Sequence, residues 1–316
     1  MNERVKVLIA YDGSAYADAA LDDLRRAGLP REAEALIVSV SDGLVNPSPS
    51  IADIAGTALT SRRVTSAIAL VREQEARALE EAKEFAAKAG DRVRSDFPDW
   101  EVRTEGIAGT PSQELVQRAD EWKPDLVVVG PQGRSALGRF FLGSISKKLA
   151  TESRSSVRVA RRAVEKSDDK SLRIMIGVDG SPGSERAVRL VGRRVWPAGT
   201  EVRIVAVDDS ASPRRIAHIL PTAEDMIRSN NEEAAGKALQ MAEWAADELR
   251  AIGLRVSVAI EKGEAQRILI EEARKWNADS IFVGSRGLDR PDERLGLGSV
   301  STGLVTNATC TVEIVR

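Results

Sequence analysis

The sequence has one cysteine, Cys310, and one histidine, His218. A single cysteine cannot form a disulfide within the chain, which fits a reducing compartment. The N-terminal segment lacks the apolar core of a signal peptide. No Ser-His-Asp set, Cys/His cluster or Glu-x-x-His metal pair is found. We therefore expect a cytoplasmic protein, with no assigned catalytic residue and no assigned metal ligand.

Long apolar runs and an excess of one charge are also missing. No run approaches eighteen apolar residues, so no membrane-spanning segment is expected. The 46 basic residues are balanced by 48 acidic ones, and neither residues 1–162 nor residues 163–316 are strongly basic, so no nucleic-acid partner is expected. The length of 316 residues and a hydrophobic content of 42% suggest two ordinary globular domains.

The two halves of the chain repeat one pattern. Residues 7–14, which end in Asp-Gly-Ser, return as residues 175–181, so that Asp12 matches Asp179. A second apolar run that ends at Val40 returns at the same offset and ends at Val207. The repeat predicts a duplicated domain. With one histidine, a histidine-based mechanism shared by both copies is excluded.

Each copy alternates short apolar strands with helices. In the first copy we predict strands near 5–11, 34–41, 100–107, 125–130 and 156–161, and helices near 14–27, 63–95, 111–122 and 144–152. In the second copy we predict strands near 172–178, 201–207, 254–260, 279–284 and 311–316, and helices near 183–195, 222–251, 265–276 and 299–307. This alternation favours a parallel sheet covered on both faces. The charged series from Arg72 to Lys88 indicates a solvated helix face. The predicted domains are 1–162 and 172–316, joined by a polar linker at 163–171.

A glycine-bearing loop follows the fourth strand of the first copy. The apolar run Leu126–Val129 is followed by Gly130, Gly133 and Gly143, and Ser144 is well suited to be the N-cap of the next helix. Backbone N–H groups at such a helix start can face a phosphate. The spacing is neither that of a P-loop nor that of the Rossmann fingerprint.

These residues resemble the universal stress protein family, whose ATP-binding signature is Gly, two residues, Gly, nine residues, Gly and then Ser or Thr. Gly130, Gly133, Gly143 and Ser144 meet this signature at every position. The Asp-Gly-Ser turn after the first strand occurs in both copies, so the chain resembles a tandem member of the family. The resemblance implies two five-stranded α/β domains that are Rossmann-like and similar to the adenine-nucleotide α-hydrolases. Their strand order would be 3-2-1-4-5, with ATP at the carboxyl ends of strands one and four.

The resemblance also implies which residues contact the ATP, which could carry Mg²⁺. Asp12 and the backbone of Val40 would lie on its adenosine side. The glycines and Ser144 would hold its ribose and phosphates. The expected nucleotide-binding residues are Asp12, Gly13, Ser14, Val40, Gly130, Gly133, Arg134, Ser135, Gly143 and Ser144 in the first copy, and Asp179, Val207, Gly284, Gly287, Gly298 and Ser299 in the second. Alternatively, the two aspartates could merely cap the helices that follow, the strand-four glycines could be simple turn residues, and Ser144 could only cap its helix.

The glycine loops of the two copies differ in length and charge. In the second copy ten residues separate Gly287 from Gly298, and they include three acids, whereas the first loop carries two arginines and no acid. The three acids are Asp289, Asp292 and Glu293, and the two arginines are Arg134 and Arg139. Carboxylates disfavour a bound anion, so we expect residues 1–162 to bind ATP better than residues 163–316. Alternatively, the arginines of the second loop, Arg286, Arg290 and Arg294, neutralise these acids and both copies bind.

Members of the family commonly dimerise through their fifth strands, which implies an internal pseudo-dimer through strands 157–161 and 312–316. Arg158 and Glu313 are equivalent positions of opposite charge, and we expect them to face each other. A homodimer of the whole chain is a further option.

Three functions are compatible with the sequence. The first is an ATP-binding stress or regulatory protein that acts through nucleotide-dependent conformation or partner binding, with at most slow ATP hydrolysis. The second is a nucleotide-free interaction scaffold. The third, an ATP pyrophosphatase or a related enzyme, is disfavoured because the expected Ser-Gly-Gly-x-Asp-Ser loop is absent.

Overall fold

The computed structural model describes residues 4–41, 62–134, 142–161, 171–208, 224–287 and 296–316. Residues 163–170 of the expected linker lie outside these ranges, and so does the candidate ligand residue Ser135. The charged loop residues Arg139, Asp289, Arg290, Asp292, Glu293 and Arg294 also lie outside them.

Both halves alternate strands and helices close to the predicted positions. The first half contains β1 (Val5–Ala10), α1 (Ala15–Asp23), the 3-10 turn η1 (Leu24–Arg26), β2 (Ala33–Ser41), α3 (Arg62–Asp96), β3 (Glu101–Ala108), α4 (Pro111–Trp122), β4 (Leu126–Val129), α5 (Ser144–Glu152) and β5 (Ser156–Val159). The second half contains β6 (Arg173–Val178), α6 (Pro182–Arg193), β7 (Glu201–Asp208), α8 (Glu224–Arg250), β8 (Arg255–Lys262), α9 (Ala265–Lys275), β9 (Ser280–Gly284), α10 (Ser299–Asn307) and β10 (Thr311–Val315).

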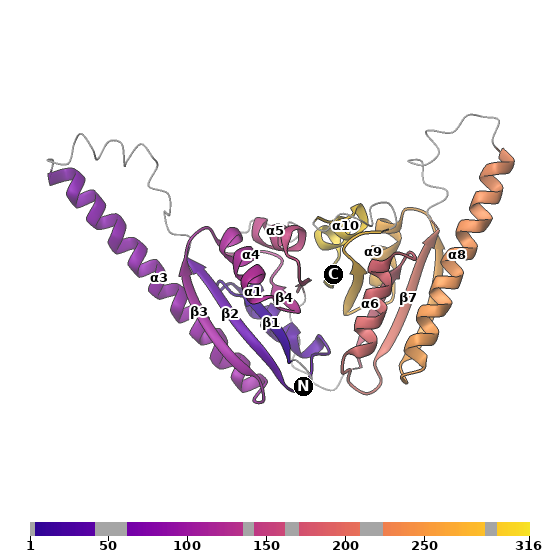
Figure 1. The fold of residues 1–316 in the computed structure, drawn as a ribbon, viewed down its shortest axis with the longest axis horizontal. Coiled ribbons are helices and arrows are strands. Elements are labelled where there is room, and N and C mark those ends of the chain that lie inside the picture. The colour runs from indigo at the N-terminus through magenta and orange to yellow at the C-terminus, as the bar shows by residue number, and fades with distance from the viewer. Residues whose placement is uncertain (1–3, 42–61, 135–141, 162–170, 209–223, 288–295) are drawn as a thin grey trace.

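All ten strands join one sheet in the order β3-β2-β1-β4-β5-β10-β9-β6-β7-β8. Within each half the paired strands are parallel and follow the order 3-2-1-4-5, which confirms the predicted fold class. The halves meet where β5 pairs with β10 in antiparallel register. Figure 1 shows the two halves side by side, with the long helices α3 and α8 at the outer ends. Within the described residues, no helix combines the length and the apolarity needed to cross a membrane.

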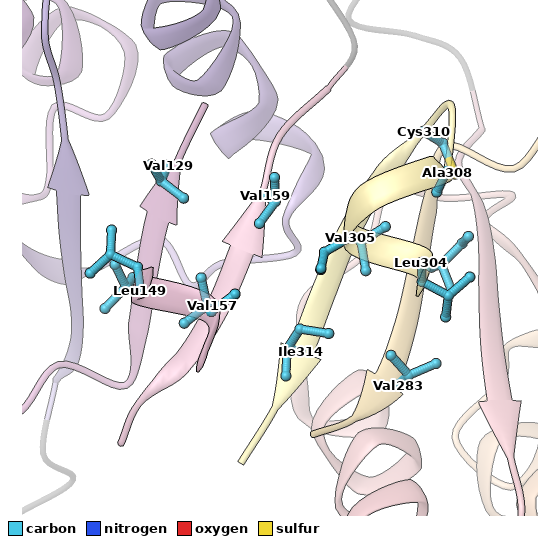
Figure 2. Packing of buried hydrophobic residues seen from close by; sticks show 14 of the residues in the cluster. Val129, Leu149, Val157, Val159, Val283, Leu304, Val305, Ala308, Cys310 and Ile314 are labelled. Carbon is cyan, nitrogen blue, oxygen red and sulfur yellow. The ribbon is translucent and has the colours of Figure 1, made fainter. Parts of the chain in front are cut away.

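The two faces of the sheet are packed differently. Successive residues of a strand point to opposite faces, and on one face a single apolar cluster runs from the first half into the second. Figure 2 shows this cluster at the junction, where Leu149 of α5 and Leu304 of α10 cover neighbouring strands. Cys310 belongs to it, as a buried thiol. On the other face each half has its own separate apolar cluster.

Buried charges lie between those two separate clusters. Arg158 of β5 faces Glu313 of β10, as predicted, and its guanidinium donates to the Glu313 carboxylate at 2.9 Å. Arg158 also donates to Asp23 at 2.6 Å, and Arg194 donates to Glu313. Burial alone would lower the pKa of Arg158, but the Asp23 and Glu313 carboxylates raise it above its ordinary value. The four side chains form a buried network of two cations and two anions, and we call it the junction network.

Two equivalent arginines complete the junction in a reciprocal way. Arg161, after β5, donates to the carbonyl oxygens of Val305 and Thr306 near the end of α10. Arg316, after β10, donates to the carbonyl oxygens of Ala150, at 2.6 Å, and of Thr151 near the end of α5. The last carbonyls of a helix lack partners inside it, and cations near them are favourable. Each half therefore caps a helix of the other, as the matching positions in the repeat require.

Candidate functional site

The Asp-Gly-Ser turn after β1 orients a carboxylate. The Oδ1 atom of Asp12 accepts the N–H of Ser14 at 3.0 Å, and Gly13 between them has a φ of 75°. Ser14, not Asp12, is the N-cap of α1, because its Oγ accepts the N–H of Ala17. The second copy repeats this arrangement, with Asp179 accepting from Ser181 and Ser181 capping α6. The alternative that the two aspartates merely cap helices is therefore wrong.

One glycine of the first loop is needed by the fold itself, and a second lies against the Asp12 carboxylate. A Cβ on Gly130 would lie 2.9 Å from the backbone oxygen of Tyr16, so this glycine lets β4 approach α1 closely. A Cβ on Gly133 would lie 2.8 Å from Oδ2 of Asp12. In the second copy Gly284 likewise packs on the backbone of Gly183, and Gly287 on Asp179. The strand-four glycines are therefore more than simple turn residues, because they allow close packing of neighbouring elements.

Gly143 differs, because the fold does not require a glycine there. Its φ of −62° suits any residue, and among the described residues a Cβ would meet no atom closer than 3.4 Å, an ordinary contact. Gly143 is also the N-cap of α5, whereas Ser144 is the first residue of the helix. The prediction that Ser144 is the N-cap was thus wrong by one residue, and in the part of the chain that the structure describes no side chain caps this helix start.

Ser146 fixes the helix start against the strand end. Its buried Oγ donates to the carbonyl oxygen of Gly130 at 2.6 Å. Ser301 makes the same bond to Gly284 in the second copy, at 2.8 Å. Sequence reasoning missed this pair, although both serines stand at the offset that relates Ser144 to Ser299. The bond holds the first turn of α5 at the carboxyl end of β4.

A cavity of about 550 Å³ opens at this place, between β1, β2, β4 and the helices α3 to α5. Seven of the predicted residues line it, namely Asp12, Val40, Gly130, Gly133, Arg134, Gly143 and Ser144. Gly13 and Ser14 are not among its described lining residues. The cavity lies where the strand order reverses, the usual ligand position in open α/β sheets.

Helix α3 supplies a wall of the cavity that the sequence did not predict. Glu81, Ala82 and Phe85 line it, although we had assigned the series from Arg72 to Lys88 to a solvated face. Ala82 is buried and Glu81 is exposed, so α3 contributes both a buried apolar residue and an exposed charged residue to the cavity wall. The local sequence of a long charged helix does not show which of its residues face the sheet. The contribution of α3 to the cavity wall is therefore seen only in the packed structure.

Arg134 connects the glycine loop with that wall. Its backbone N–H donates to Oδ2 of Asp12 at 3.2 Å, and its Nε donates to the Asp12 carbonyl oxygen at 2.5 Å. Its Nη1 donates to Glu81 at 3.0 Å, and the guanidinium carbon lies 4.2 Å from the centre of the Phe85 ring. The cation therefore lies between a carboxylate, a carbonyl oxygen and an aromatic face.

The second copy keeps the turn and the glycine loop but surrounds them differently. A hollow of about 470 Å³ beside Asp179 is lined by α6 and α8 residues that include Glu185, Arg189 and Trp244. Among its described lining residues there is none of the candidate loop glycines. Gly298 is the N-cap of α10 and Ser299 its first residue, while Val207 of β7 packs against the shared core.

The fold and the loops define the class, a chain of two fused, doubly wound α/β domains with a strand–glycine loop–helix motif in each. The sequence matches the model of the Universal stress protein family over residues 4–161 and again over residues 171–316. The chain therefore belongs to the universal stress protein family, as a tandem member.

Other universal stress proteins are similar to the whole chain or to one half of it. A universal stress protein of Mycolicibacterium smegmatis is 29% identical over 98% of this chain and 96% of its own length. The Bacillus subtilis universal stress protein YxiE is 29% identical over 49% of this chain and 98% of its own length. A solved universal stress protein from Archaeoglobus fulgidus has a similar fold, with a TM-score of 0.62 and 19% identity over 98% of this chain and 96% of that one.

Proposed function

We propose that this protein binds ATP in the cavity of its first domain and uses the bound nucleotide to regulate its conformation or its partners. The observation that carries the proposal is Gly143. The backbone there accepts any residue and the space around it accepts a methyl group, yet the sequence has a glycine beside the cavity. A ligand that approaches the backbone closely accounts for it, as phosphates do at helix N-termini.

The rest of the cavity supports an adenine nucleotide. Its volume falls within the range of about 300–1,000 Å³ that is usual for small-molecule sites. Asp12 and the strand end at Val40 offer polar groups to the cavity, and the first turn of α5 offers N–H groups that have no partner inside the helix. Mg²⁺ could accompany the phosphates, and Asp12 is the predicted first-copy residue that would offer a carboxylate to it.

The test compares two equivalent variants of the full chain by isothermal titration with ATP. Gly143→Ala should keep the stability of the wild type and weaken ATP binding at least tenfold, because its methyl group would stand at the expected phosphate position. Gly298→Ala makes the same change in the second copy and should leave the first-domain binding unchanged. A stoichiometry of two equal sites would overturn the preference for the first domain.

The identity of the bound ligand needs a second measurement. Mass spectrometry of ligand released from the purified protein should identify an adenine nucleotide. Release of no nucleotide, together with no heat on titration, would instead favour an interaction scaffold. Cys310 is buried, and burial raises its pKa to about 12, so the thiol stays protonated at neutral pH.

A further inference from the structure

We infer that Glu81 on α3 sets how strongly the first-domain site prefers phosphorylated adenosine, because it competes with the ligand's phosphates for the guanidinium of Arg134. This inference rests on the proposed ATP site and adds a specificity-determining residue that lies outside the glycine loop. The competing bond is the 3.0 Å contact between Nη1 of Arg134 and Oε1 of Glu81 at the cavity wall.

The geometry restrains the cation without burying it. The Arg134 side chain keeps 48% of its surface exposed, and the Glu81 side chain keeps 53%. One face of the guanidinium covers Phe85, and Phe85 in turn covers Gly13 of the Asp-Gly-Ser turn. An arginine held in this way is available to a stronger partner, because exposed ion pairs contribute little and phosphate accepts two parallel hydrogen bonds from a guanidinium.

The charges around the cavity make the competition selective. Asp12 and Glu81 both line it, so an entering triphosphate meets two carboxylates and one arginine in the described wall. While Glu81 holds Arg134, that carboxylate neutralises the cation that a phosphate would use. Adenosine has no phosphate group that could bind the guanidinium of Arg134. The balance between Glu81 and the ligand therefore affects nucleotides and leaves the nucleoside unaffected.

The second copy has other residue types at the three equivalent sequence positions. The buried residues Ala86 and Ala89 of α3 match Ala242 and Ala245 of α8. The same alignment places Lys237 at the position of Glu81 and Met241 at that of Phe85. The glycine-loop alignment places Leu288 at the position of Arg134. The three residue types that form this arrangement therefore occur together at these positions in the first copy and not in the second, and the first copy is the one that we expect to bind ATP.

The experiment titrates ATP and, separately, adenosine into the full chain. Glu81→Gln should tighten ATP binding about fivefold, which corresponds to about 1 kcal/mol, the upper end for an exposed ion pair. Adenosine binding should not change. The matched control is Glu80→Gln, which removes the neighbouring exposed carboxylate and its bond to Lys83 but does not touch the cavity. This control should leave both affinities unchanged.

A second variant identifies Arg134 as the group through which Glu81 acts. Arg134→Gln combined with Glu81→Gln should cancel the gain for ATP. If the wild type binds ATP and Glu81→Gln binds it with the same or a lower affinity, this inference is overturned and the proposed function stands. Equal tightening of ATP and adenosine would also overturn it, because a wider cavity and not a freed cation would explain the gain. Absence of ATP binding in every variant would overturn both proposals.

Discussion

Removal of Arg158 should destabilise the protein more than the loss of any surface arginine. This side chain is fully buried and donates to Asp23 at 2.6 Å and to Glu313 at 2.9 Å. In Arg158→Met, Asp23 keeps only its bond from Thr311 in the described part of the network, while Glu313 keeps Arg194. Breaking a buried ion pair on one side typically costs about 3–5 kcal/mol, because a charge is left uncompensated. We expect a loss in that range.

The assay is urea unfolding at pH 7, followed by circular dichroism. Asp23→Leu introduced into Arg158→Met should recover much of the loss, because it removes the stranded carboxylate and leaves the neutral pair of Glu313 and Arg194. Leucine is the residue at the equivalent position of the second copy, Leu190. Arg103→Met removes an exposed strand arginine and should leave the unfolding curve unchanged.

Two results would refute this reasoning. A loss below about 1 kcal/mol in Arg158→Met would mean that the junction network contributes no more than a surface pair. A double variant as unstable as the single one would mean that the lost packing of the arginine, and not the uncompensated carboxylate, accounts for the effect.

Three further predictions concern single side chains. Ser146→Ala should cost about 1–3 kcal/mol in urea unfolding, because the carbonyl oxygen of Gly130 loses its buried donor. Arg161→Met should cost a similar amount, measured in the same way, because the carbonyl oxygen of Val305 loses a donor from the other half. The pKa of Cys310 is raised by burial from 9.0 to about 12, so its contribution to stability is complete below pH 9 and is lost as the pH rises toward 12. The free energy of unfolding should fall there by at most ~1.4 kcal/mol per pH unit, and Cys310→Ala should abolish that part of the slope. An identical slope in both proteins would contradict the assignment.

The fold was predictable because its signals are local and repeated. Short runs rich in β-branched residues, such as Leu126–Val129, favour buried strands, and the duplication allows each element to be predicted twice. The pairing of Arg158 with Glu313 was also predictable, since equivalent residues meet at a two-fold axis. Asp23 and Arg194 were not, because they have no charged counterparts at the equivalent positions and reach the junction only through helix packing.

The candidate site was predictable where its residues lie in the loops that follow β1 and β4. Asp12 and the loop glycines come together as the strand order requires. The position of Glu81 in the cavity wall was not predictable, because the way α3 lies against the sheet depends on the buried alanines along its length. The cap at Gly143 was misassigned by one residue because serine is a good cap by composition, whereas this helix start leaves its donors without a side-chain cap.

The strand pairing at the centre of the sheet also determines how the molecule responds to dilution. Because β5 and β10 bond to each other within one polypeptide, their meeting is a first-order event with a fixed effective concentration. Lowering the protein concentration cannot separate the halves, and no exchange of halves between molecules is needed to maintain them. Both strands are occupied on each side, so any association of two whole chains must use other surfaces, such as the outer strands β3 and β8.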